Sequence, residues 1–170
     1  TENPYDLALT DKGFFAVEFT DKQGETSVKY TRDGNFTLNE SGELVTQDGD
    51  RVLGTNGQPV KMDPLKDTQI NVQGQIIQDG KVAATIQVTD FEDYNYLKRY
   101  GENYFEPIDG ATEKDTTAKV YAGYLETSNI SVVTEMVNMI TVSRAYETNQ
   151  KVITTYDGTL DIAANQLGKV

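Results

Sequence analysis

The chain has 170 residues, of which 37% are hydrophobic and 25% are charged, so it has enough apolar residues for a sizeable core in one or two domains. Its formal net charge of -12 disfavours anionic partners, and we therefore expect no nucleic-acid ligand. The sequence contains neither cysteine nor histidine, which excludes disulfides, thiolate metal sites, cysteine nucleophiles and histidine-dependent triads.

The chain shows neither a signal peptide nor a membrane span. It contains no apolar run of the roughly twenty residues needed to cross a bilayer. It begins at Thr1 without a methionine and enters a strand-like pattern almost at once, so we interpret it as a fragment or a processed form.

The first ninety residues predict an antiparallel β domain built from short hairpins. Strand-like runs at 7–9, 14–19 and 28–31 are separated by turn residues. Glycines then recur at steps of seven or eight, each after an aspartate, serine or asparagine: Gly34, Gly42, Gly49 and Gly57. After prolines at positions 59 and 64, further strands are expected at 69–72, 75–78 and 82–88.

Residues 90–105 carry seven large apolar side chains whose spacing fits neither a strand nor a helix. We expect an aromatic-rich loop that closes the open end of the β core. The alternative is a platform of Tyr and Phe rings that binds a glycan or a peptide. Residues 107–119 are small and polar and are expected to form a surface loop, followed by a last strand at 120–125.

The stretch from Tyr124 to Gly168 contains no proline and predicts a long helix over about 130–167, with Asn129 or Ser131 as its N-cap and Gly168 as its stop. Its apolar and small residues recur at steps of three and four, which is typical of one helical face with a heptad-like seam. Ser143 and Asn149 interrupt that seam, and Gly158 weakens the helix.

Two arrangements of this helix remain open. It either breaks near Gly158 and folds back on its own domain, or it packs against helices of other chains or a partner segment outside this sequence. The sequence therefore predicts an α+β protein, mainly β, with a β domain over 1–127 and a C-terminal helical segment over 128–170.

Acidic clusters are the remaining candidates for chemistry. Asp48 with Asp50, and Asp90 with Glu92 and Asp93, lack the spacing of a calcium loop. No phosphate-binding glycine loop, metal-ligand cluster or nucleophile motif is present. We therefore expect no enzyme, no cofactor and no metal.

Three stretches resemble one family. The sequence at 8–19 and 30–60 (ALTDKGFFAVEF and YTRDGNFTLNESGELVTQDGDRVLGTNGQPV) is similar to the first β segment of the bacterial flagellar rod and hook proteins. The sequence at 125–153 (LETSNISVVTEMVNMITVSRAYETNQKVI) resembles their C-terminal helix motif, and 90–111 resembles a loop of that family. The resemblance is greatest to the basal-body rod proteins, and the ending NQLGKV is similar to that of Gram-positive members. The motif residues are Leu125, Glu126, Ser128, Asn129, Arg144, Tyr146, Glu147 and Asn149.

The resemblance implies a structural subunit of the flagellar basal-body rod. Such proteins are exported through the flagellar type III apparatus without a cleaved signal peptide and assemble outside the cytoplasmic membrane, in the periplasm or cell wall. Their N- and C-terminal helices form an inner coiled-coil layer around the export channel of a helical tube that transmits torque. The partners implied are copies of this chain, neighbouring rod or hook subunits, and the family's N-terminal helix, which this sequence lacks.

The apolar pattern of the predicted helix and the family resemblance both place the subunit contacts on the C-terminal helix. Arg144, Glu147 and Lys151 are expected to lie on the helix surface as solvated or intersubunit charges. The predicted packing face comprises Met136, Met139, Ile140, Tyr146, Ile153, Tyr156, Leu160, Ala163 and Leu167. The competing hypothesis is a secreted β-domain binding module that recognises a glycan or peptide through the Tyr/Phe-rich stretch.

Overall fold

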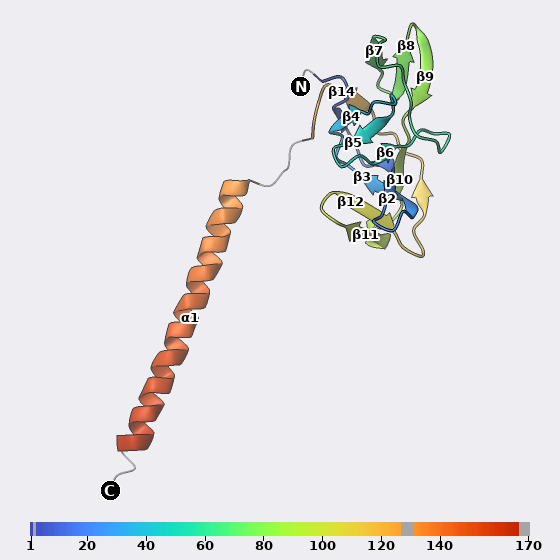
Figure 1. Cartoon of the computed structure of the whole chain (residues 1–170). Helices are drawn as coiled ribbons and strands as arrows, with labels where there is room; N and C mark the ends of the chain where they lie inside the picture. Colours follow the sequence, from blue (N-terminus) through green and yellow to red (C-terminus); the bar gives the residue numbers. More distant parts are fainter. Residues whose placement is uncertain (2, 127–130, 167–170) are drawn as a thin grey trace. The chain divides into compact units, whose positions relative to one another are not determined.

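The computed structural model describes residue 1, residues 3–126 and residues 131–166, except for the side chains of 132 and 164–166. The chain divides into two compact units, Thr1–Glu126 and Thr127–Val170. The strands belong to the first unit and one long helix belongs to the second (Figure 1). The predicted fold class, mainly antiparallel β with a long C-terminal helix, is confirmed.

The larger sheet is organised around β2 (Phe14–Thr20). Along one edge β2 pairs with β3 over six residues, and along the other it pairs with β10 near its start and with β6 at its middle. The strand order is β11-β12-β3-β2-β6-β5-β4, with β10 also pairing β13. The bounds are β3 Thr26–Thr31, β4 Phe36–Leu38, β5 Leu44–Thr46, β6 Arg51–Val52, β10 Val88–Phe91, β11 Leu97–Tyr100, β12 Tyr104–Pro107 and β13 Glu113–Lys114.

Two smaller sheets complete the β domain. The first joins β7 (Thr68–Ile70), β8 (Gln75–Gln78) and β9 (Lys81–Thr85) in chain order. The second pairs β1 (Leu7–Leu9) with β14 (Val120–Ala122), and Leu7 lies opposite Ala122. This pairing places the beginning of the β domain beside its last strand.

One type of turn closes three hairpins. The side-chain oxygens of Asp21, Asn39 and Asn71 each accept hydrogen bonds from the backbone N–H groups two and four residues later, at 2.8–3.0 Å. The residue three positions later is a glycine with φ between +74° and +87°. That left-handed conformation costs glycine little, so the repeated pattern sets the positions of these hairpins.

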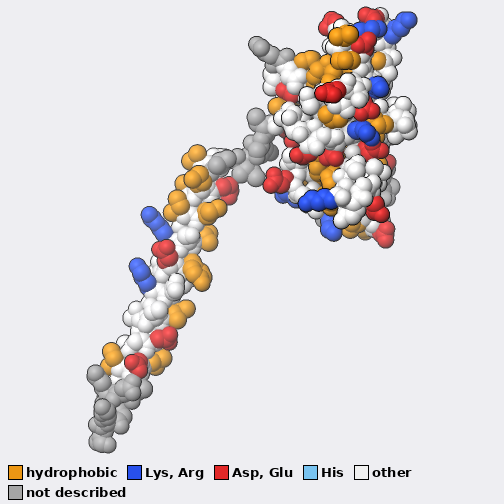
Figure 2. Space-filling view, in the orientation of Figure 1, with side chains coloured by type: hydrophobic (Ala, Val, Ile, Leu, Met, Phe, Trp, Pro, Cys, Tyr) orange, Lys and Arg blue, Asp and Glu red, His pale blue; other side chains and the backbone are white. Residues whose placement is uncertain are grey.

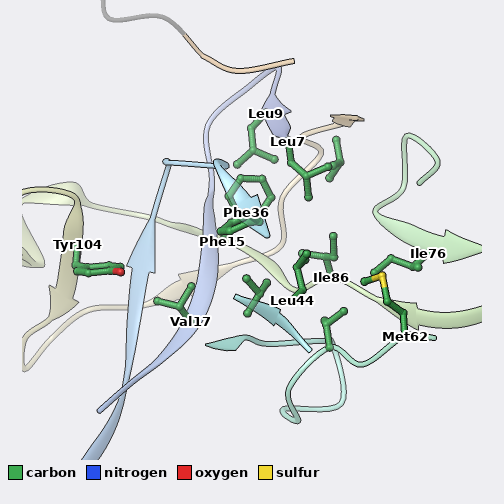
Figure 3. Close-up of a cluster of buried hydrophobic side chains, with 13 residues drawn as sticks. Leu7, Leu9, Phe15, Val17, Phe36, Leu44, Met62, Ile76, Ile86 and Tyr104 are labelled. Carbon is green, nitrogen blue, oxygen red and sulfur yellow. The ribbon is translucent and has the colours of Figure 1, made fainter. Parts of the chain in front are cut away.

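Both faces of β2 are buried, which explains why its sequence is apolar without strict alternation. Phe15 and Val17 belong to the main core cluster, whereas Phe14 and Ala16 belong to a second cluster that contains Tyr30, Leu53 and Phe91. In the main cluster, the ring of Phe15 meets that of Phe36 edge-on at 5.2 Å between centroids. Figure 3 shows these side chains converging from β1, β2, β4, β5 and the segments around β8.

The prediction of an aromatic loop over 90–105 was wrong. Apart from a short 3₁₀ turn at Tyr94–Tyr96, most of this stretch is sheet, because β11 and β12 form a hairpin that pairs through Tyr104 and Phe105 with β3. The polar stretch 107–119 is mostly irregular, although β13 pairs with β10.

The helix α1 spans Val132–Gln166 and is continuous through Gly158, so the arrangement with a break near Gly158, which the sequence left open, is not observed. Ser131 caps the helix: its Oγ accepts a hydrogen bond from the N–H of Thr134 at 3.4 Å, and its carbonyl accepts one from the N–H of Glu135 at 3.0 Å. Glu135 adds a negative charge to the first turn, where the helix dipole favours one. The 35 residues extend over roughly 50 Å at about 1.5 Å per residue.

Candidate assembly surface on the C-terminal helix

The apolar side chains of α1 are exposed. Met139, Tyr146 and Tyr156 are each 68–72% exposed, and Ile153 and Leu160 are 61% and 64% exposed. Figure 2 shows hydrophobic side chains along the length of the helix. Isolated exposed apolar residues are ordinary in proteins, but a contiguous set on one element indicates an interaction surface.

Eight exposed residues of the continuous helix form a regular heptad seam. One series repeats every seven residues and a second follows it by three, which is the a and d spacing of a two-stranded coiled coil. The eight described seam residues are Met139, Val142, Tyr146, Asn149, Ile153, Tyr156, Leu160 and Ala163. Leu167 continues the first series but lies outside the described residues.

Two residues of the predicted packing face lie away from this seam. At about 100° per residue, Ile140 is roughly 120° around the helix axis from Tyr146. Met136 and Ile140 instead lie with Val133 and Val137 on a second apolar face confined to the first turns, where all four are more than half exposed. The predicted face therefore combines two separate surfaces.

Sequence reasoning missed Val142, which is 69% exposed and lies in the seam. It follows Met139 by three residues and precedes Asn149 by seven, so a strict heptad count would have identified it.

The side of α1 that carries the second apolar face becomes charged further along the helix, where Arg144, Glu147 and Lys151 are found. Within residues 131–166, no ion pair joins Arg144, Glu147 or Lys151 to another described side chain. The apolar seam is thus long, whereas the apolar second face ends after Ile140.

Threonines on the side of α1 away from the first seam series, roughly 160° around the axis from it, do not present free hydroxyl groups. The Oγ1 atoms of Thr141, Thr148 and Thr155 each donate a hydrogen bond of 2.8 Å to the carbonyl four residues earlier.

Of the remaining motif residues, Ser128 and Asn129 lie outside the described residues. Leu125 is partly exposed, at 38%. Glu126 accepts two hydrogen bonds from Arg32, from Nε at 3.0 Å and from a terminal guanidinium nitrogen at 2.9 Å. Arg32 also donates to the carbonyl of Asp11, so this arginine ties the last described residues of the β domain to the loop before β2.

Tyr94 and Tyr100 of the aromatic stretch pack against their own domain. Tyr94 meets the ring of Phe14 edge-on at 5.6 Å, and its hydroxyl donates to Asp90 at 2.6 Å. Burial, followed by this hydrogen bond, raises the pKa of Tyr94 to about 12. Tyr100 packs on Phe19 and faces the ammonium group of Lys29 at 4.6 Å from its ring centre. These contacts account for the rings as parts of the fold.

One acidic residue of each cluster noted in the sequence, Asp50 and Asp90, accepts a hydrogen bond from a tyrosine hydroxyl of the fold. Asp50 accepts a hydrogen bond of 2.7 Å from the buried hydroxyl of Tyr104. Among the described residues, no cluster of three or more acidic side chains is arranged to hold a metal ion, and α1 does not have the apolar length that a membrane span requires.

Comparisons with known proteins agree with this division of the chain. Residues 8–88 match the profile of the flagellar hook protein FlgE/F/G D1 domain, and residues 121–167 match that of the flagellar basal body rod FlgEFG protein C-terminal region. The flagellar basal-body rod protein FlgF of Caulobacter vibrioides is 34% identical over 175 residues, covering 100% of this chain and 68% of the relative. The chain belongs to the flagellar basal-body rod and hook protein family.

Two further relatives extend the comparison within this family. The basal-body rod protein FlgG of Buchnera aphidicola from Schizaphis graminum is 34% identical over 92% of this chain and 63% of its own length. The hook-basal body complex protein FlhO of Bacillus subtilis is 31% identical over 100% of this chain and 67% of its own length. The chain therefore spans slightly less than two thirds of the FlgG relative. The relatives give no support to the binding-module hypothesis.

Proposed function

We propose that this chain is a structural subunit of the flagellar basal-body rod, which polymerises by burying the heptad seam of α1. The exposed seam is the observation that carries the proposal, because a helix in water does not retain such a surface without something to cover it. Family membership supports a structural role in place of a catalytic one. The resulting tube would surround the export channel and transmit torque.

Burial of the seam would supply the main driving force for assembly. Full burial of a large apolar side chain contributes about 1.5–3 kcal/mol. Six large seam residues are exposed, namely Met139, Val142, Tyr146, Ile153, Tyr156 and Leu160, so the gross gain is on the order of 10 kcal/mol before the entropic cost of association. Repeated contacts between unlike surfaces give an open helical array.

We propose two kinds of partner for the seam: α1 of neighbouring copies or rod subunits, and a helix N-terminal to the β domain, as the family resemblance implies. The pairing of Leu7 with Ala122 supports the second partner. A segment leading into β1 would approach the β domain where the chain leaves it toward α1, so both helices would start from one place.

The proposed site of action is the basal body outside the cytoplasmic membrane, in the periplasm or cell wall, reached by type III export without a cleaved signal peptide. The names of the relatives place those proteins in the basal body. The absence of histidine and cysteine suits a subunit that has neither a metal nor a disulfide requirement.

Adjacent substitutions on α1 test the assembly surface. Ile153→Asp places a charge in the seam, whereas Thr154→Asp places the same charge on the neighbouring residue, roughly 100° around the helix. We expect sedimentation velocity to show that Ile153→Asp abolishes association, that Thr154→Asp leaves it nearly unchanged, and that both variants keep the β-domain circular dichroism. Equal association of the two variants would contradict the seam assignment.

A further inference from the structure

The chain leaves the β domain through residues 124–126, which follow β14 and complete the first unit. We call these residues the exit segment. Along the chain, the last backbone-to-backbone hydrogen bond between described residues of this domain comes just before it, from the N–H of Gly123 to the carbonyl of Asp6 at 2.7 Å. Within the segment, Tyr124 is 63% exposed and meets the ring of Tyr121 edge-on at 6.4 Å between centroids. A contact this exposed anchors the segment only weakly.

Arg32 holds the end of the exit segment. Its Nε and one terminal nitrogen donate to the same carboxylate oxygen of Glu126, at 3.0 and 2.9 Å. Its other terminal nitrogen donates to the carbonyls of Asp11 and Gly13, at 3.0 and 3.3 Å. All three guanidinium nitrogens are therefore engaged. The planar fork of arginine reaches several acceptors at once, whereas the ammonium group of a lysine is a point charge.

The stability of the β domain does not by itself account for this arrangement. The side chains of Arg32 and Glu126 are 32% and 49% exposed, and exposed ion pairs contribute little to folding. Arg51, whose side chain is 50% exposed, makes a similar pair with Glu18, but inside the large sheet, where the two residues lie opposite each other on β6 and β2. The Arg32–Glu126 pair instead joins residues 94 positions apart at the point where the chain leaves the domain.

The Arg32–Glu126 pair determines how much chain lies between the β domain and α1. With Glu126 held, the four residues 127–130 lie between it and the helix cap Ser131. With Glu126 released, Gly123 carries the last backbone anchor, and the seven residues 124–130 lie before Ser131. Each further residue whose backbone must be fixed adds to the conformational entropy lost. An exit segment that is fixed beforehand therefore lowers the cost of bringing α1 against a partner.

We propose that Arg32 is a positioning residue for assembly, which keeps the exit segment on the β domain by holding Glu126 and so fixes where the chain departs toward α1. This inference rests on the proposed function, because such positioning matters only if α1 binds a partner. It adds to that function a residue of the β domain that acts on assembly without lying in the seam.

Substitutions in the complete chain test this role. Arg32→Gln and Glu126→Gln each remove one side of the pair, and a variant with both substitutions completes a double-mutant cycle. Arg51→Gln is the matched control, because it removes a half-exposed ion pair inside the sheet. For each variant, light scattering gives the concentration of half-maximal assembly, and urea unfolding gives the midpoint of the β domain. Nitrogen-15 relaxation gives the order parameter of the Glu126 N–H at concentrations where the chain is monomeric.

The positioning role predicts that Arg32→Gln and Glu126→Gln each raise the concentration needed for assembly by at least about fivefold. The double variant should be no worse than the more affected single variant, because both substitutions break the same contact. In Arg32→Gln, the order parameter of the Glu126 N–H should fall below about 0.6, while the urea midpoint stays unchanged. Arg51→Gln should match the wild type in assembly and in the order parameter.

Three results would overturn the positioning role and leave the seam assembly standing. They are wild-type assembly or a wild-type order parameter in Arg32→Gln, additive effects in the double variant, and a urea midpoint that falls in parallel with assembly, since the role of Arg32 would then be structural only. A wild-type chain that stays monomeric at every concentration overturns the proposed function together with this inference.

Discussion

The β domain and α1 differ in how they satisfy their apolar residues. In the β domain, β2 buries both of its faces within two clusters, and Phe15 and Val17 are fully enclosed. In α1, Tyr146, Ile153 and Leu160 are more than 60% exposed. The β domain thus has a core of its own, whereas the apolar side chains of α1 stay exposed. We therefore propose that one chain combines a self-sufficient domain with a helix that carries half of an interface and whose stability depends on partners.

The largest expected effect separates these two regions. Phe15→Ala removes a ring packed against Phe36 in the main core, and we expect a loss of about 3–5 kcal/mol in the free energy of unfolding. Urea unfolding followed by tyrosine near-ultraviolet circular dichroism measures it. Tyr146→Ala on α1 should change the same transition by less than about 0.5 kcal/mol. Similar losses for both variants would contradict the division into a packed domain and an exposed helix.

A smaller effect concerns a charge buried in the β domain. Lys29 is 4% exposed, and its ammonium group pairs with Glu106 above the ring of Tyr100. Glu106→Gln leaves this ammonium group without its carboxylate, so we expect a loss of about 1–3 kcal/mol in the free energy of unfolding. Lys22→Gln, at an exposed lysine of the β2–β3 turn, is the control and should have little effect.

The same pair predicts a pH dependence. The hydrogen bond from Lys29 lowers the pKa of Glu106, against the smaller opposing effect of burial. A carboxyl group with a lowered pKa contributes stability above its unfolded pKa, about 4.3, and loses that contribution as the pH falls through the folded pKa. The difference in unfolding free energy between wild type and Glu106→Gln should therefore shrink below about pH 4. A difference independent of pH would contradict the ion pair.

The smallest expected effect sharpens the account of α1. A Cβ at Gly158 would meet no atom within 4 Å, so Gly158→Ala should favour the helix by about 1 kcal/mol without steric cost. Circular dichroism at 222 nm should become more negative, while the urea midpoint of the β domain stays unchanged. Unchanged or reduced helicity would indicate that the helix does not continue through this position.

The sequence predicted features that depend on neighbouring residues. The helix was expected over 130–167 and is described over Val132–Gln166, because its period and the cap at Ser131 are local signals. The turns at Gly42 and Gly49 were likewise visible, since each needs a glycine at positive φ.

Features that depend on distant residues were not predictable in the same way. The stretch 90–105 was expected to be a loop because its periodicity is irregular, yet Tyr104 is fixed in β12 by pairing with Thr31, more than seventy residues earlier.

The packing face was predicted only in part. Met136 and Ile140 were grouped with Tyr146 because steps of three and four alone do not distinguish a seam from two adjacent faces, and only the continuous helix separates them. The sequence left a break at Gly158 open, because a glycine cost of about 1 kcal/mol does not by itself decide whether a long helix is interrupted.

The most direct test of the central claim is the light-scattering mass of the wild-type chain, recorded with its 222 nm ellipticity over a hundredfold range of concentration. The account predicts that mass and helicity rise together, because the seam becomes stable as it is buried between chains. A monomer whose helicity does not depend on concentration would contradict the claim that α1 is an assembly element.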